Sequence, residues 1–116
     1  MNYRHAFHAG NFADVFKHII LARLIEYLKL KDAAFRVIDT HAGIGRYDLT
    51  GPEAARSPEW VDGIKRLFDT PLPPEAAALA EPYVAAVRSE NPDGELKTYP
   101  GSPLLIRKLL RPQDRL

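Results

Sequence analysis

Hydrophobic residues recur every three to four positions along residues 11–30, which is the spacing of one face of a helix. Asn11 is suited to cap this helix, and Asp14 is placed to bond back to the N–H of the cap residue. The stripe consists of Phe12, Val15, Phe16, Ile19, Ile20, Leu24, Tyr27 and Leu28. Since Leu21 and Ile25 lie on the other side, we expect a buried helix that is packed on two sides.

A strand and a glycine-containing turn are expected next. Residues 35–40 (Phe-Arg-Val-Ile-Asp-Thr) are short and rich in β-branched side chains, which favours a strand. Residues 41–47 follow as a turn with glycine at positions 43 and 45. Gly51, Pro52 and Pro58 oppose a long helix directly after this turn.

Prolines divide the remainder of the chain. We expect helices over residues 58–68 and 74–90, with Pro74 in the first turn of the second helix and Pro82 kinking or splitting it. A turn at residues 91–94 and an extended piece at residues 95–99 then lead to a last helix that ends near Leu110. Ser102 is placed to cap that helix.

These elements divide the chain into three segments. Residues 1–47 hold the N-terminal tail, the first helix, the strand and its turn. Residues 48–96 look like a small helical subdomain inserted before the partner helix of the strand, and residues 97–116 return to the core. One strand and one crossover helix cannot make a stable parallel sheet, so we expect the N-terminal part of a larger α/β fold.

Charge follows the same division. The net charge is +1, but residues 48–96 carry four basic and ten acidic side chains, a net −6, and the remainder carries +7. An anionic partner such as nucleic acid would favour the basic remainder, although two ordinary solvated faces would have the same charge pattern. Because the chain has no cysteine, no apolar run long enough to cross a bilayer and no signal peptide, we expect a cytoplasmic protein.

The pattern Asp39-x-x-x-Gly43-x-Gly45 directly follows the predicted strand. Glycines permit tight turning and the close approach of a ligand, and open α/β sheets bind nucleotides at the carboxyl ends of their strands. The spacing matches neither the dinucleotide fingerprint nor the P-loop. It fits better the turn that binds S-adenosylmethionine in Rossmann-like methyltransferases, with a purely structural turn as the alternative.

Three polar residues elsewhere have both a functional and a structural interpretation. His41 adjoins the glycine turn, where it is either a ligand-binding or a surface histidine. Ser102 caps a helix, and a helix N-terminus also binds anions. Lys17 and His18 lie off the apolar stripe of the first helix and either point into a cleft or face solvent.

The N-terminal tail concentrates unusual chemistry, since three of the four histidines lie between Tyr3 and His18. Aromatic, histidine and arginine side chains of this kind stack on unpaired bases and pair with phosphates, whereas a frayed terminus is the alternative. His5, His8, His18 and Asp14 could in principle bind a metal ion. None has the spacing of a known zinc motif, so we expect no metal.

Three motifs together carry a resemblance: Tyr-Arg-His-x-Phe-His-Ala-Gly-Asn-x-Ala-Asp-Val-x-Lys-His, Asp-Thr-His-Ala-Gly-x-Gly-x-Tyr and Tyr-Pro-Gly-Ser-Pro. In this order and spacing, and over essentially all 116 residues, the chain resembles the N-terminal part of the RlmJ family of bacterial 23S rRNA adenine-N6 methyltransferases, once described as proteins for the use of external DNA. The resemblance implies a Rossmann-like class I methyltransferase fold, S-adenosylmethionine as cofactor, 23S rRNA as partner and a monomer.

The resemblance also implies roles for individual residues. His18, His41 and Ser102 would contact the cofactor, with Asp39, Gly43 and Gly45 in its binding turn. Tyr3, His5 and Lys17 would lie near the target adenosine. The Asp/Asn-Pro-Pro-aromatic motif of the family is absent from these residues, so we assign no catalytic residue here and expect the 116-residue chain to be inactive alone. The alternative function is nucleic-acid binding without methyl transfer.

Overall fold

The computed structural model describes residues 3–116. Its longest element is the helix α1, Phe12–Leu28, and the side chain of Asn11 caps it by accepting a hydrogen bond from the backbone N–H of Asp14. The helix and its cap are therefore confirmed. The carboxylate of Asp14, however, accepts from the N–H of Gly10, not from that of the cap residue.

The burial of α1 differs from the prediction of packing on two sides. The buried positions are Asp14, His18, Ala22 and Ile25, which follow one another along a single face. The residues Phe12, Phe16, Ile20, Leu24, Tyr27 and Leu28 are exposed. The apolar spacing identified the helix correctly, but in this structure only the face that carries Asp14 and His18 meets the rest of the protein.

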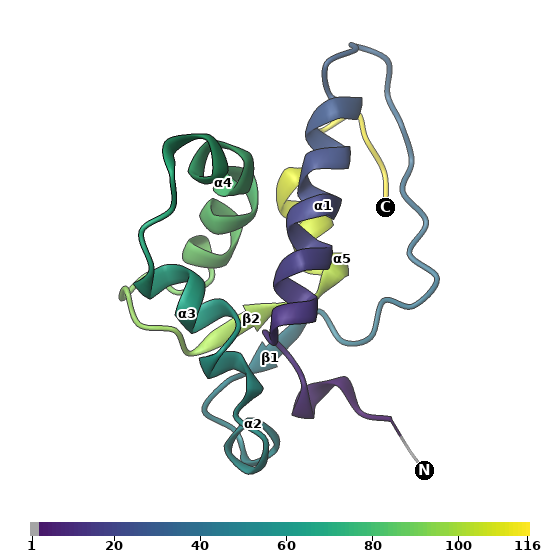
Figure 1. Cartoon of the computed structure of the whole chain (residues 1–116). Helices are drawn as coiled ribbons and strands as arrows, with labels where there is room; N and C mark the ends of the chain where they lie inside the picture. The colour runs from purple at the N-terminus through teal and green to yellow at the C-terminus, as the bar shows by residue number, and fades with distance from the viewer. Residues whose placement is uncertain (1–2) are drawn as a thin grey trace.

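The predicted strand at residues 35–40 is wrong in this structure. The segment is extended and makes one isolated parallel bridge, between Arg36 and Arg115. It lies in the long connection that runs beside α1 in Figure 1. A strand needs a continuous partner, and within residues 3–116 only the backbone around Arg115 pairs with this segment. Arg111 and Asp114, joined by an ion pair of 2.9 Å, fix that contact.

A two-stranded antiparallel sheet that was not predicted pairs β1, Arg46–Asp48, with β2, Thr98–Pro100. Tyr47 lies opposite Tyr99, and both side chains are buried. The sheet joins segments about 50 residues apart, and it places the glycine turn next to the start of the last helix.

Helices occupy much of residues 52–89, within the segment 48–96 that was predicted to be helical, but the boundaries of the individual helices differ from the prediction. The helices are α2, Pro52–Arg56, the 3₁₀ turn η2, Glu59–Val61, α3, Ile64–Asp69, and α4, Pro74–Ser89. Gly63 interrupts the predicted helix at 58–68, because its backbone lies directly against Gly10. A Cβ atom at position 63 would come within 2.0 Å of the Gly10 carbonyl oxygen. Pro82 does not split α4, and Pro74 opens it as expected.

The last helix is α5, Ser102–Leu109, and its cap is Gly101, so the prediction that Ser102 caps it is wrong. α1, α4 and α5 pack against one another, with α5 behind α1 in Figure 1. Their shared core contains Ala22, Tyr83, Val87 and Leu105 together with Tyr99 of β2. No helix within residues 3–116 is long and apolar enough to span a bilayer.

Candidate functional site

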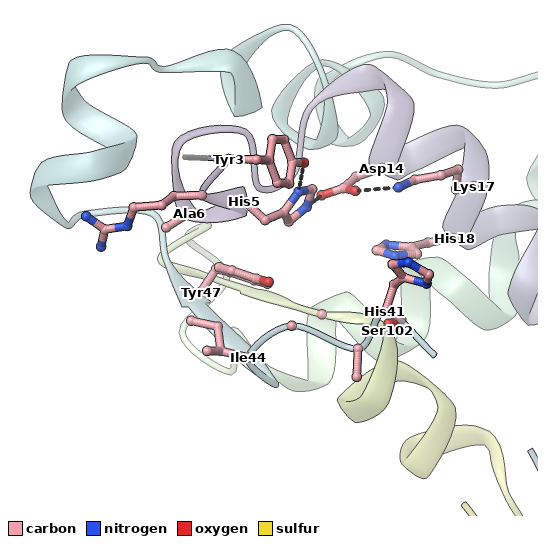
Figure 2. A pocket seen from close by; sticks show the side chains of 14 residues that line it. Tyr3, His5, Ala6, Asp14, Lys17, His18, His41, Ile44, Tyr47 and Ser102 are labelled. Carbon is pink, nitrogen blue, oxygen red and sulfur yellow. Dashed lines mark hydrogen bonds and ion pairs between the residues drawn. The ribbon is translucent and has the colours of Figure 1, made fainter. Parts of the chain in front are cut away.

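A cavity of about 540 Å³ opens between the N-terminal tail, the first turns of α1, the glycine turn and the start of α5. Figure 2 shows the side chains that point into it. Seven of the nine residues that the sequence singled out line this cavity: Tyr3, His5, Lys17, His18, His41, Gly43 and Ser102. The structure thus brings the predicted cofactor and substrate residues together in one place.

The wall of the cavity formed by the glycine turn depends on two glycines. Gly43 has a positive φ of 62°, and a Cβ atom there would lie 2.7 Å from the hydroxyl of Tyr47. A Cβ atom at Gly101 would lie 2.5 Å from the carbonyl oxygen of Ile44. The N–H of Gly101 donates to the carbonyl of Gly45 at 2.8 Å, so the turn rests directly on the start of α5.

Asp39 and Gly45, the other two predicted residues, do not line the cavity but support it. The hydroxyl of Ser102 donates to the Asp39 carboxylate, whose second oxygen accepts from the backbone N–H of His41 at 3.2 Å. Asp39 therefore ties the residue after the extended segment to the first turn of α5. Gly45 contributes the backbone carbonyl described above.

Asp14 is the charged centre of the site, whereas the sequence interpretation considered it only as part of a helix cap or as a metal ligand. Its side chain is 1% exposed and accepts hydrogen bonds from Nε2 of His5 at 2.7 Å and from the N–H of Gly10 at 3.0 Å. Lys17 Nζ lies 3.6 Å from its other oxygen. Burial acts to raise the pKa of Asp14, but the bonds from His5 and Gly10 outweigh it, so the pKa is lowered and the carboxylate stays charged.

His18 lies one helical turn after Asp14 on α1 and is 7% exposed. Its Nδ1 is 2.7 Å from the hydroxyl of Tyr99, which is in turn 2.9 Å from the hydroxyl of Tyr83. Burial lowers the pKa of His18, and the neighbouring carboxylate of Asp14 opposes this only in part. His18 is therefore neutral at pH 7.

Two ion pairs with residues of the helical segment 48–96 hold the N-terminal tail over the cavity. Arg4 pairs with Glu53 of α2 at 3.2 Å, and His8 pairs with Glu59 of η2 at 2.8 Å. The ring of Tyr3 stacks on that of His8 with centroids 5.3 Å apart. His8 thus supports Tyr3 from outside the cavity and is not a part of its lining.

The described residues gather no set of three or more histidine, aspartate or glutamate side chains that could hold a metal ion. His5 and Asp14 bond to each other, whereas His8 turns to Glu59 and His18 to Tyr99. The four residues considered as metal ligands therefore do not converge on one point, since His8 and His18 each bond to a different residue away from the His5–Asp14 pair.

Sequence reasoning missed Tyr47 and Tyr99 as parts of the site, and it weighed Asp14 only as a cap residue or a metal ligand. A carboxylate on an otherwise apolar stretch of helix was the available signal for Asp14, but a capping role already explained it. Tyr47 and Tyr99 meet across a sheet whose pairing the sequence did not reveal.

Comparison with known proteins finds relatives that are named as ribosomal RNA methyltransferases. The family model described as "Ribosomal RNA large subunit methyltransferase D, RlmJ" matches residues 32–116. Proteins named ribosomal RNA large subunit methyltransferase J from Escherichia coli K12 and Haemophilus influenzae are 49% and 48% identical to the chain over 117 residues, and the match covers 100% and 99% of it. The chain spans about 40% of the length of these two relatives.

A solved structure is also similar to the chain. The crystal structure of protein LPL1258 from Legionella pneumophila Philadelphia 1, assigned to family model DUF519, superposes with a TM-score of 0.81 at 41% identity. The superposition covers 93% of this chain and 38% of that one.

Proposed function

The chain belongs to the RlmJ family of large-subunit ribosomal RNA methyltransferases, and from this we propose that it forms the N-terminal part of an enzyme that transfers the methyl group of S-adenosylmethionine to N6 of an adenine in 23S rRNA. The observation that carries the proposal is the cavity, because residues predicted to bind cofactor and residues predicted to bind substrate line it together. The named relatives support the choice of rRNA over use of external DNA.

The donor set of the cavity fits S-adenosylmethionine, which carries a carboxylate, an ammonium group and a sulfonium. The backbone N–H of Ser102 begins α5 at the wall of the cavity, where it would stabilise an anionic carboxylate. Asp39, bonded to Ser102 and to the N–H of His41, would hold these two cavity residues in place from behind the lining. Gly43 and Gly101 let Tyr47 and the Ile44 carbonyl pack closely against them, which holds the turn in place at the wall of the cavity. When bound, the cofactor supplies an activated methyl group.

The substrate side of the cavity lies under the tail. Tyr3 is 71% exposed, so its ring is available for a base, and His5 and Lys17 flank the buried Asp14. In our proposal, these residues bind and orient the adenosine, and His18, His41 and Ser102 hold the cofactor beside it. The contribution of this chain is therefore orientation of the two reactants.

The proposal also covers the fold, the oligomeric state and the cellular location of the protein. We propose a Rossmann-like class I core to which residues 1–47 and 97–116 contribute, with residues 48–96 as its inserted helical subdomain. The single parallel bridge between Arg36 and Arg115 supports strand pairing of this kind. We further propose a monomer that acts in the cytoplasm without a metal ion.

Cofactor binding is tested by titrating the 116-residue chain with S-adenosylmethionine in a calorimeter. We expect binding, and we expect His41→Ala to weaken it about five- to tenfold, the loss of roughly one hydrogen bond. His8→Ala is the matched control, because His8 pairs with Glu59 outside the cavity lining. No binding by the unmodified chain, or equal losses in both variants, would contradict the assignment of the site.

Methyl transfer is tested in a chimera, in which this chain replaces the matching 40% of the Escherichia coli relative. We expect the chimera to form N6-methyladenosine in 23S rRNA, detected by mass spectrometry of the digested nucleosides. We expect the 116-residue chain alone to form none. A folded chimera that binds S-adenosylmethionine and leaves the RNA unmodified would refute the proposed activity.

A further inference from the structure

Three buried polar side chains from different elements form a hydrogen-bonded row that ends in the cavity. Tyr83 of α4 and Tyr99 of β2 are both 0% exposed, and their hydroxyl oxygens are 2.9 Å apart. The Tyr99 hydroxyl is 2.7 Å from Nδ1 of His18 on α1. The rings of His18 and Tyr99 are also stacked, with centroids 5.7 Å apart. The row thus reaches from the core of the protein to the wall of the site.

The direction of these hydrogen bonds follows from a count of protons and acceptors. The two hydroxyl groups bring two protons, and each buried proton needs an acceptor because leaving it unpaired is costly. Within residues 3–116, the acceptors that the row offers are the oxygens of Tyr83 and Tyr99 and Nδ1 of His18. If Nδ1 carried a proton and donated to Tyr99, one hydroxyl proton of the row would have no acceptor.

Only one arrangement satisfies both hydroxyls. Tyr83 donates to the oxygen of Tyr99, and Tyr99 donates to Nδ1 of His18. A neutral histidine that accepts at Nδ1 carries its proton on Nε2. The depressed pKa of His18, which burial causes, agrees with a neutral ring.

The second nitrogen of His18 opens to the cavity. Every buried side-chain nitrogen or oxygen in the described part of the chain has a hydrogen-bond partner. No such partner is found for Nε2 of His18 among residues 3–116, so this atom is not fully buried, and His18 lines the cavity beside His41 and Ser102 (Figure 2). The proton on Nε2 is therefore presented to whatever occupies the cavity.

We propose that Tyr99 is a positioning residue, which fixes His18 as the tautomer that donates from Nε2 to an acceptor atom of the bound ligand. The identity of the ligand as S-adenosylmethionine rests on the proposed function, whereas the tautomer rests on the hydrogen-bond row alone. An acceptor of the ligand, such as a carboxylate or hydroxyl oxygen, suits this donor.

The first test reads the tautomer in the unmodified chain and uses one substitution only to assign the signals. The chain has four histidines, so a long-range ¹H–¹⁵N spectrum of the ¹⁵N-labelled, ligand-free chain resolves eight ring nitrogens, and His18→Gln assigns the pair of interest. At pH 7.5 we expect a pyridine-like shift for Nδ1 of His18 and a pyrrole-like shift for Nε2. The reverse pattern, or the spectrum of a protonated ring, would overturn the proposal.

Two matched variants then separate positioning from simple support. Tyr99→Phe and Tyr83→Phe each remove one buried hydroxyl. Tyr99→Phe removes the donor to Nδ1, so we expect both His18 nitrogens to move to intermediate shifts as the two tautomers exchange. In Tyr83→Phe the proton of Tyr99 still has only Nδ1 to accept it, so the wild-type pattern should persist. Equal effects of the two variants, or no effect of Tyr99→Phe, would refute the role of Tyr99.

Ligand binding supplies the last readout. Titration with S-adenosylmethionine should show a larger loss of affinity for Tyr99→Phe than for Tyr83→Phe, by about two- to tenfold, the value of one neutral hydrogen bond. If the unmodified chain does not bind this ligand but shows the expected tautomer, the proposed function fails and the positioning of His18 stands. If the unmodified chain binds S-adenosylmethionine but His18 shows the other tautomer, the proposed function stands and the positioning role of Tyr99 fails.

Discussion

Replacing Asp14 by asparagine tests the charged centre of the site. The substitution keeps the size of the side chain and one carbonyl oxygen, but it removes the negative charge that His5, Gly10 and Lys17 face. A hydrogen bond to a charged group contributes about 1.5–3 kcal/mol and a neutral one about 1 kcal/mol. The two bonds at Oδ2 should each weaken by about 1 kcal/mol, so we expect the free energy of unfolding to fall by about 2 kcal/mol.

The loss should depend on pH in a defined direction. The folded-state pKa of Asp14 is lowered from the ordinary 3.8, because the bonds from His5 and Gly10 outweigh the opposing effect of burial. A depressed carboxylate pKa stabilises the fold above the unfolded-state pKa, and this contribution is lost as the pH falls through the folded-state value. The difference between wild type and Asp14→Asn should therefore be full at pH 7 and should narrow below about pH 4.

Urea denaturation measures this difference. Trp60 is the single tryptophan of the chain and touches the Gly10 region, so its fluorescence reports unfolding next to the substitution. Asp69→Asn is the control, because Asp69 pairs with Lys65 at the surface and should lose less than about 0.5 kcal/mol. If Asp14→Asn loses no more than the control at pH 7, or if its deficit is the same at pH 3, the reasoning is wrong.

Two further predictions concern packing. Leu24→Ala and Ile25→Ala alter adjacent aliphatic residues of α1, of which Leu24 is 57% and Ile25 1% exposed. Chemical denaturation should show that the free energy of unfolding falls by about 2–4 kcal/mol for Ile25→Ala and by less than about 1 kcal/mol for Leu24→Ala. Similar losses in the two variants would contradict the burial of α1. Gly101→Ala should destabilise the chain strongly, because a Cβ atom at position 101 would lie 2.5 Å from the Ile44 carbonyl oxygen. Gly45→Ala should destabilise it only slightly, because the nearest atom to a Cβ atom at position 45 is the Cβ of Leu104 at 4.0 Å. A lowered melting temperature for Gly45→Ala alone would reverse this assignment.

The sequence predicted α1 well because its signals are local. Asn11 and the spacing of the apolar residues define a capped helix whatever surrounds it. Which face is buried is not a local property when both faces carry large apolar side chains. The face with Asp14 and His18 is buried because α4 and α5 pack there, and Phe12 and Phe16 on the opposite face remain exposed. Periodicity alone could not have chosen between them.

The site was only partly predictable for a similar reason. Gly43 and Ser102 belong to short motifs, and the structure brings both to the cavity. Tyr99 was not identified, because its contact with His18 spans 81 positions and depends on the sheet that pairs it with Tyr47. The expected strand at 35–40 failed because β-branched side chains favour an extended backbone but do not supply a partner.

Ion pairs connect the acidic segment, residues 48–96, with the basic N-terminal tail. Glu53 and Glu59 of the acidic segment hold Arg4 and His8 of the tail, so part of that acidity positions the tail. On the proposed function, an RNA phosphate could engage Arg4 only in competition with Glu53. Lys17 is different: it is 63% exposed at the mouth of the cavity, and its only ion pair within residues 3–116 is the 3.6 Å contact with the buried Asp14. Of the cations that line the cavity, Lys17 is therefore the one that a phosphate can reach at the least cost in existing contacts.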